Sequence, residues 1–177
     1  QAVTESRSAG NDFLASVCRD WEASSADVEA LGVQRAVARI GLPLSMAGGV
    51  LPRLALPLRM FVGGRLGNGR QFCPWIHMAD TVGALRFLIE NEDAHGIFNI
   101  SAPEPVTNAE FTRALARALR RPSWLPVPGF AIQAIFGEMA TIVLGGERAL
   151  PQRLQAAGYA FRYPDLGAAL QDIISAM

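Results

Sequence analysis

The segment from Phe72 to Ile89 constrains the fold of this chain more than any other. Its first part ends in Trp75-Ile76-His77 and is rich in the aromatic and β-branched residues of a short strand. Asp80 then opens a stretch with helical periodicity, and one face of it carries four apolar residues: Val82, Leu85, Leu88 and Ile89. We therefore expect a short strand followed by an amphipathic helix to about Asn91, with Asp80 as the helix cap.

A helix and a second strand are predicted upstream. Apolar residues between Asn11 and Leu31 recur at helical spacing, Asn11 or Asp12 can cap the start, and Gly32 can end the helix. Residues 33–40 have a strand pattern, and Gly41-Leu42-Pro43 is expected to be the turn that ends it. A helix that feeds a short apolar strand is typical of a parallel-sheet protein. Residues 1–10 are small and polar, and we expect them to be frayed.

The middle of the chain continues this alternation. A short helix is expected through Met60, kinked or broken at Pro57, and the glycine-rich residues 63–69 are typical of a hairpin or loop. Residues 98–101 have the pattern of a short strand. Thr107 and Glu110 have the spacing of a capping box, which predicts a helix from there to about residue 120, with Phe111, Leu115 and Leu119 inward.

The composition changes after Arg121, where three prolines form a rigid connector: Pro122, Pro126 and Pro128. Helices are expected near 129–144, 149–157 and 164–176, with Gly158 ending the second and Pro164 in the first turn of the third. We therefore predict an α/β protein. Residues 1–121 would hold the late part of a doubly wound, Rossmann-like sheet with substrate-side elements, and residues 122–177 a mostly helical C-terminal subdomain.

Composition argues against several classes of protein. The formal net charge of the 177 residues is zero, which argues against a nucleic-acid or anionic-membrane binder. No apolar run reaches the length of a membrane span, so we expect no membrane partner. Cys18 and Cys73 are expected to be free thiols in a reducing, cytoplasmic compartment. Cys73 and His77 have the spacing of a metal-binding pair, but no second pair exists, so we expect no metal site.

The strand–helix segment resembles the (Tyr/Trp)-(Ile/Val)-His-x-x-Asp element of the extended short-chain dehydrogenases, which include the NAD(P)-dependent sugar-nucleotide epimerases and dehydratases. An ordered set of motifs over nearly the whole chain resembles one subfamily, the "epimerase family" with a small helical C-terminal domain. The motifs are Asp12-Phe13-Leu14 to Trp21-Glu22, Arg39-Ile40-Gly41, Gly48-Gly49-Val50-Leu51-Pro52, Gly67-Asn68-Gly69-Arg70-Gln71, Trp75-Ile76-His77 to Asp80, residues 98–103, 105–108 and 125–128, Gly137-Glu138-Met139-Ala140, and Tyr163-Pro164-Asp165-Leu166.

The resemblance implies the C-terminal part of a longer enzyme that binds NAD or NADP and transfers a hydride reversibly at a carbon bearing a hydroxyl. The family's Gly-x-Gly-x-x-Gly loop is absent from this sequence. All sixteen basic residues are Arg, so the family's Tyr-x-x-x-Lys pair cannot exist here either. Tyr159 and Tyr163 match nothing catalytic. We therefore expect no catalytic residue, no bound cofactor and no activity in this chain alone.

The resemblance also implies candidate contacts. Gly41, Leu42 and Pro43 follow a strand end, where open α/β sheets bind ligands, and would lie near the cofactor; the alternative is a simple turn. Arg70 would bind the diphosphate of a nucleotide-sugar substrate, although related epimerases place an Arg where Cys73 stands; the alternative is a solvated Arg. Trp75 would line the substrate pocket or the core.

Two further residues have structural alternatives. His77 is included among the substrate contacts, but a hydrogen bond near the start of the Asp80 helix is the favoured role. Arg39, on the strand before Gly41, is expected to be a paired structural residue.

A different class of function fits the same absences. The chain would then be a non-enzymatic interaction or regulatory module, or a pseudoenzyme remnant. In a fragment, the strand at 33–40 would have an unpaired edge, and Phe13, Leu14, Val17 and Trp21 would lack the sheet on which they normally pack. We therefore expect the isolated chain to form a homodimer through that edge, to domain-swap or to aggregate. The sequence does not identify the substrate or the choice between NAD and NADP.

Overall fold

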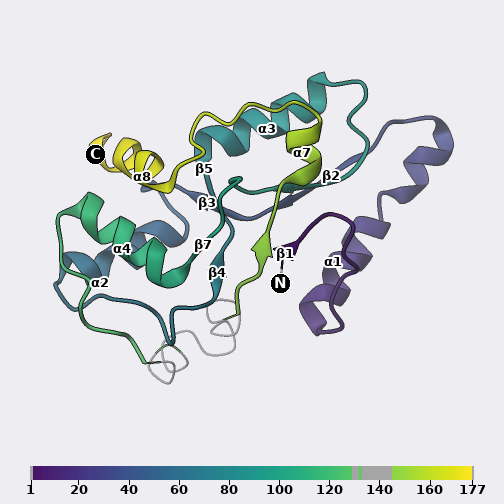
Figure 1. Ribbon diagram of the computed structural model, residues 1–177. Coiled ribbons are helices and arrows are strands. Elements are labelled where there is room, and N and C mark those ends of the chain that lie inside the picture. Colours follow the sequence, from purple (N-terminus) through teal and green to yellow (C-terminus); the bar gives the residue numbers. More distant parts are fainter. Residues whose placement is uncertain (1, 129–131, 133–144, 177) are drawn as a thin grey trace.

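The computed structural model describes residues 2–128, 132 and 145–176 (Figure 1). The described strands form four pairs, of which three are parallel and one is antiparallel. Helices alternate with these strands along the chain, so the α/β fold class expected from the sequence is confirmed. No helix among the described residues is long and apolar enough to cross a membrane.

The first helix is shorter than predicted. Helix α1 (Phe13–Ala23) begins at Asp12, whose Oδ1 accepts the N–H of Ala15 at 2.7 Å, as expected for a cap. A separate 3₁₀ helix, η1 (Ala26–Leu31), follows and ends at Gly32, which has φ +74°. The helix divides because Ser24 and Ser25 turn their hydroxyls back to main-chain carbonyls of α1.

Strand β2 (Ala36–Ile40) pairs in parallel with β6 (Gly96–Ile100) over their full length. Arg39 on β2 joins Glu22 on α1 through two hydrogen bonds of 2.7 and 2.8 Å. The expected structural role of Arg39 is thus confirmed. The Arg39 guanidinium lowers the pKa of the Glu22 carboxyl, mainly through these hydrogen bonds.

The turn predicted at Gly41-Leu42-Pro43 was wrong for its last two residues. They begin β3 (Leu42–Leu44), which pairs in parallel with β5 (Trp75–His77). The N–H of Gly41 donates to the Ile100 carbonyl at 3.0 Å and that of Leu42 to the Pro74 carbonyl at 2.7 Å. The chain therefore leaves one strand pair and enters the next without turning back.

Helix α2 (Val50–Arg59) continues through Pro57 and ends at Met60, so the expected break at Pro57 does not occur. Residues 67–69 form a turn, and Leu66 makes an isolated parallel bridge with Val127 in place of a hairpin. Strand β4 (Phe72–Cys73) then pairs antiparallel with β7 (Val106–Thr107). Long-range pairing with the proline connector thus decides the conformation of the glycine-rich segment.

Helix α3 (Met78–Glu90) has a different buried face from the one predicted. Val82 and Ile89 are 59% and 84% exposed, whereas Thr81, Ala84 and Leu88 are buried. Strand β5 ends at His77 and runs into α3 without a linker. The prediction was right for Leu88, which is buried, and wrong for Val82 and Ile89, whose places on the buried face are taken by Thr81 and Ala84.

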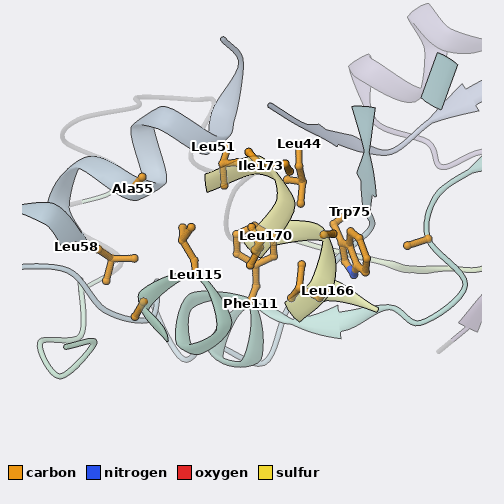
Figure 2. Packing of buried hydrophobic residues seen from close by; sticks show 13 residues of the cluster. Leu44, Leu51, Ala55, Leu58, Trp75, Phe111, Leu115, Leu166, Leu170 and Ile173 are labelled. Carbon is orange, nitrogen blue, oxygen red and sulfur yellow. The ribbon is translucent and has the colours of Figure 1, made fainter. Parts of the chain in front are cut away.

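The core joins helices from both ends of the chain. Figure 2 shows Leu51 and Leu58 of α2 pointing toward Phe111 and Leu115 of α4 (Asn108–Leu119). Helix α8 (Leu166–Ser175) completes this cluster with four buried residues: Leu166, Ala169, Leu170 and Ile173. A second cluster lies between α3, β6 and α7 (Gln152–Ala156) and includes Ile76, Leu88, Phe98 and Leu154. Burying each such Leu or Phe stabilises the fold by about 2 kcal/mol.

The N-terminal segment is not frayed at residues 2–5. Strand β1 (Ala2–Val3) pairs in parallel with β8 (Arg148–Ala149), which also shortens the helix expected from 149. The carboxylate of Glu5 is buried and accepts the N–H groups of Asn99 and Arg153, at 3.1 and 3.3 Å. These hydrogen bonds anchor the segment on β6 and α7.

The C-terminal helices match the prediction in part. The helix expected at 129–144 falls, apart from Ile132, outside the described residues. Gly158 has φ +92° just after α7 ends, as expected for a helix stop. Pro164 was predicted in the first turn of the last helix, but α8 begins at Leu166 with Asp165 as its cap.

Candidate functional site

The predicted contact residues of two separate sequence segments lie side by side in the β3–β5 pair. Leu42 is opposite Trp75, and Pro43 is opposite Ile76, which precedes His77. In the chain, β3 directly follows β2, and β5 directly follows β4. The β3–β5 pair lies near the point where β2 ends at Ile40 and β6 ends at Ile100. The carboxyl ends of parallel strands are where open α/β sheets bind ligands.

The Gly41–Pro43 segment uses its main-chain donors within the sheet. A Cβ on Gly41 would lie 2.2 Å from the Pro74 carbonyl oxygen, so glycine is required by close packing of the backbone. The N–H groups of Gly41 and Leu42 already bind carbonyls, and Pro43 has none. This segment therefore offers no cradle of free N–H groups for a pyrophosphate, and its contact with a cofactor stays a prediction of van der Waals contact only.

Trp75 is fully buried in the cluster that joins α2, α4 and α8. Its indole Nε1 donates to the Glu104 carbonyl at 3.1 Å, which satisfies its single polar atom. Figure 2 shows its ring beside Leu166. Trp75 is thus a core residue in this structure, and its contact with a substrate stays a prediction.

His77 is the N-cap of α3. Its Nδ1 accepts the N–H of Ala79 at 3.1 Å, so the predicted hydrogen bond at the helix start is confirmed. Because Nδ1 accepts, the neutral ring carries its proton on Nε2, which lies 3.3 Å from Oδ2 of Asp172 on α8. Within the described structure, Nε2 is buried and has no partner in good hydrogen-bond geometry.

The surroundings of His77 act on its pKa in both directions. Burial lowers the pKa, the carboxylates of Asp172 and Asp80 oppose this, and Arg162 adds to the lowering. The ring of Tyr163 packs against His77 with centroids 3.9 Å apart, and its hydroxyl donates to Oδ1 of Asp172 at 2.8 Å. The imidazole is therefore packed between β5 and the C-terminal segment.

Asp80 does not cap α3, which corrects the prediction. Its carboxylate is buried and accepts three hydrogen bonds from one remote segment: the N–H groups of Arg162 and Tyr163, each at 2.8 Å, and the hydroxyl of Tyr159 at 3.0 Å. Burial and the Asp80 charge raise the pKa of Tyr159, so that hydroxyl remains a donor. Sequence reasoning missed this cluster because no local spacing links positions about 80 apart.

Arg70 lies apart from this cluster. Its side chain is exposed on the turn before β4, and its N–H donates to Oδ1 of Asn68 at 2.8 Å. Cys73 is half-buried, and burial raises the pKa of its thiol to about 11. The described residues contain no group of three His, Cys, Asp or Glu side chains placed to hold a metal ion.

Known proteins are similar to this chain in sequence and in fold. The chain is 42% identical over 164 residues to an epimerase family protein of Staphylococcus aureus, and 40% identical over 165 residues to one of Mus musculus. An epimerase family protein of Mycobacterium bovis is 43% identical over 171 residues. The homologues of this chain are epimerase family proteins. The three matches cover 93%, 93% and 96% of this chain, but 55%, 56% and 57% of the relatives, so the chain spans little more than half of their length.

The comparison with solved structures agrees with the sequence comparison. The human epimerase family protein solved with NADPH has a TM-score of 0.93 and 35% identity, over 100% of this chain and 60% of its own. The nucleoside-diphosphate sugar epimerase of Corynebacterium glutamicum has a TM-score of 0.79 and 32% identity, over 98% of this chain and 33% of its own. Residues 127–173 match a domain of unknown function, DUF1731. The fold is therefore that of the Rossmann-like epimerases, and the sequence resemblance to an epimerase family is confirmed.

Proposed function

We propose that this chain forms the substrate-side portion of an NAD(P)-dependent, sugar-nucleotide epimerase-like oxidoreductase. The observation that carries the proposal is the likeness over 100% of the chain to the human relative that was solved with NADPH. The second solved relative is a nucleoside-diphosphate sugar epimerase, which supports the substrate class. The chain spans 60% of the human relative, so the cofactor and the activity are proposed for a whole protein.

The residues of this chain would shape and orient the substrate side of the cleft. Leu42 and Pro43 of β3, which follow Gly41, pair with Trp75 and Ile76 of β5, and we propose that this strand pair borders the cleft. The Asp80 cluster holds the segment between α7 and α8 against the start of α3, which fixes the C-terminal helices beside the strand ends. Arg70, exposed and cationic, would bind substrate phosphate oxygens.

The chain alone does not fit the dinucleotide. It has neither the Gly-x-Gly-x-x-Gly loop nor any Lys, and the donors of the Gly41 segment are used in the sheet. The part of the relatives that lies outside the match would supply pyrophosphate binding and the Tyr–Lys pair. We therefore propose that this chain by itself neither binds NAD(P) tightly nor turns over.

A fusion protein tests the substrate side. This chain is joined to the part of the human relative that it does not match, and binding of UDP-glucose is measured calorimetrically with NADPH present. We expect saturable binding that Arg70→Gln weakens about tenfold, the loss of one charge-assisted phosphate contact. Arg53→Gln, at an exposed position on α2, is the matched control and should bind like the parent. Equal binding by both variants would remove Arg70 from the substrate site.

A second candidate function is a non-enzymatic interaction module. It is favoured by α1, which has no buried residue and leaves Phe13 and Trp21 each 77% exposed. Figure 1 shows α1 on the far side of the molecule from α2, α4 and α8. In the described structure β2 pairs only with β6, so its other edge is open to a second copy.

Light scattering across a concentration series distinguishes a monomer from a homodimer. If Trp21→Glu and Phe13→Glu abolish self-association, the exposed side of α1 mediates a homodimer. A 19.0 kDa monomer at all concentrations, with a cooperative melt, would contradict the homodimer. Gain of NADPH binding in the fusion protein, with loss of self-association, would favour the enzyme over the module.

A further inference from the structure

A cavity of about 320 Å³ lies beside the first half of α4. It is lined by Arg65, Ala109, Thr112, Arg113, Ser123, Trp124 and Pro126. None of these residues belongs to the predicted cofactor or substrate contacts. The volume is in the range of pockets that hold small ligands.

Three segments form the walls of this cavity: the glycine-rich turn with Arg65, the start of α4, and the proline connector with Trp124. Hydrogen bonds join these segments. The Arg65 carbonyl accepts the N–H of Val127, and the Val127 carbonyl accepts the N–H of Gly67, both at 2.9 Å. The N–H of Leu66 donates to Oδ1 of Asn108, the first residue of α4, at 2.8 Å. A Cβ on Gly64 would lie 2.2 Å from the Leu125 carbonyl oxygen, so the turn and the connector are in direct contact. The cavity is therefore formed before any ligand arrives.

Two guanidinium groups border the cavity with donors to spare. Arg65 donates from Nη1 to the Asn68 carbonyl and Arg113 from Nε to the Ala109 carbonyl, each at 3.1 Å. The ion pairs of the described structure include neither residue. The nearby Glu110 carboxylate accepts the N–H and the hydroxyl of Thr107 on Oε2, each at 2.7 Å, and the Arg113 charge helps to lower its pKa without forming an ion pair. Each guanidinium has five N–H groups, so several remain to bind an anion.

The third wall carries an exposed aromatic ring. Trp124 is 71% exposed, although its indole is one of the largest apolar surfaces a side chain can offer. We propose that this cavity binds a small ligand that joins an aromatic ring to a phosphate group. The ring stacks on Trp124, and the phosphate oxygens contact Arg65 and Arg113. The inference stands apart from the proposed oxidoreductase function, because it uses none of the same residues.

Calorimetric titration of the 177-residue chain with adenosine 5′-monophosphate tests this proposal. Inorganic phosphate and adenosine serve as the two halves of the probe. We expect saturable binding of the whole probe and at least about tenfold weaker binding of either half, because both stacking and charge contacts are needed. Arg65→Gln, Arg113→Gln and Trp124→Ala should each weaken binding about tenfold.

Matched variants separate the site from general charge and folding effects. Arg117→Gln, on the exposed part of α4 outside the cavity, should bind like the parent chain. Trp124→Phe keeps an aromatic face and should retain most of the affinity that Trp124→Ala loses, with an unchanged thermal melt. Absence of saturable binding would overturn the proposal. So would binding that Arg65→Gln, Arg113→Gln and Trp124→Ala leave intact, because the probe would then lie elsewhere.

Discussion

The carboxylate of Asp80 accepts the main-chain N–H of Tyr163 at 2.8 Å, although the two residues are 83 positions apart. Its other oxygen accepts the N–H of Arg162 and the hydroxyl of Tyr159. A single buried carboxylate in the first turn of α3 therefore fixes the chain between α7 and α8. Its removal should affect the whole C-terminal segment.

Asp80→Asn should destabilise the fold by about 3 kcal/mol, because an amide keeps one acceptor oxygen and turns an NH₂ group toward buried donors. The measurement is the free energy of unfolding in urea. Asp93→Asn, on the exposed loop before β6, is the control and should change stability by less than about 0.5 kcal/mol. Similar small effects for both variants would show that the Asp80 hydrogen bonds do not hold the segment.

Gly83 gives a test of the same contact in which the sign of the effect reverses. A Cβ at this position would lie 2.6 Å from the Tyr159 hydroxyl but 3.6 Å from Cζ. Gly83→Ala should therefore be destabilising in the parent chain, because the hydroxyl must leave Asp80. In a Tyr159→Phe background the same change should stabilise by up to about 1 kcal/mol, the ordinary preference of a helix for Ala over Gly. A double-mutant cycle measures it, and additive effects would contradict the packing.

The capping box of α4 predicts a local effect. Thr107 Oγ1 accepts the Glu110 N–H at 3.3 Å, and the Glu110 carboxylate accepts the Thr107 N–H at 2.7 Å. Thr107→Ala should destabilise by about 1 kcal/mol, and Thr107→Ser should restore most of it. A denaturant midpoint that does not move in Thr107→Ala would mean that the hydroxyl does not stabilise the helix.

His77 makes stability depend on pH. Burial lowers its pKa below the ordinary value of about 6.5, so between the folded and unfolded pKa values the unfolded chain binds more protons. The His77 contribution to stability is therefore complete above about pH 6.5 and is lost as the pH falls toward the folded pKa.

His77→Asn keeps a helix-capping side chain but removes this titration. Its free energy of unfolding should fall less than that of the parent between about pH 7 and pH 5.5. Parallel pH profiles for His77→Asn and the parent would contradict the lowered pKa. Asp172, Asp80 and Arg162, the charged groups that act on the His77 imidazole, are the same residues in the parent and in His77→Asn.

Features that depend on neighbours in the sequence could be predicted. The Asp12 cap, the Gly32 and Gly158 helix stops and the Thr107 capping box all follow from spacings of a few residues. Each uses side-chain or backbone chemistry that is decided within one turn of helix. These motifs placed the starts of α1 and α4 and the end of α7 correctly to within a few residues, whereas Gly32 ends the separate helix η1 and not α1.

Features that depend on remote partners could not be predicted in the same way. Asp80 has the residue type and position of a cap, but the donors it binds come from the other end of the chain. Leu42 and Pro43 look like a turn because the strand that pairs with them, β5, lies more than thirty positions away. The ordered family motifs carried that long-range information, which is why the fold class was predicted although the face of α3 was not.

Titration of NADPH into this chain and into the fusion with the remaining part of the human relative tests the central proposal most directly. Calorimetry should show no saturable binding to the 177-residue chain and micromolar or tighter binding to the fusion. That result is expected because the chain lacks a pyrophosphate loop. All of this chain nevertheless matches the fold of the relative that was solved with NADPH. Tight binding of NADPH to the chain alone, or none to a folded fusion, would contradict it.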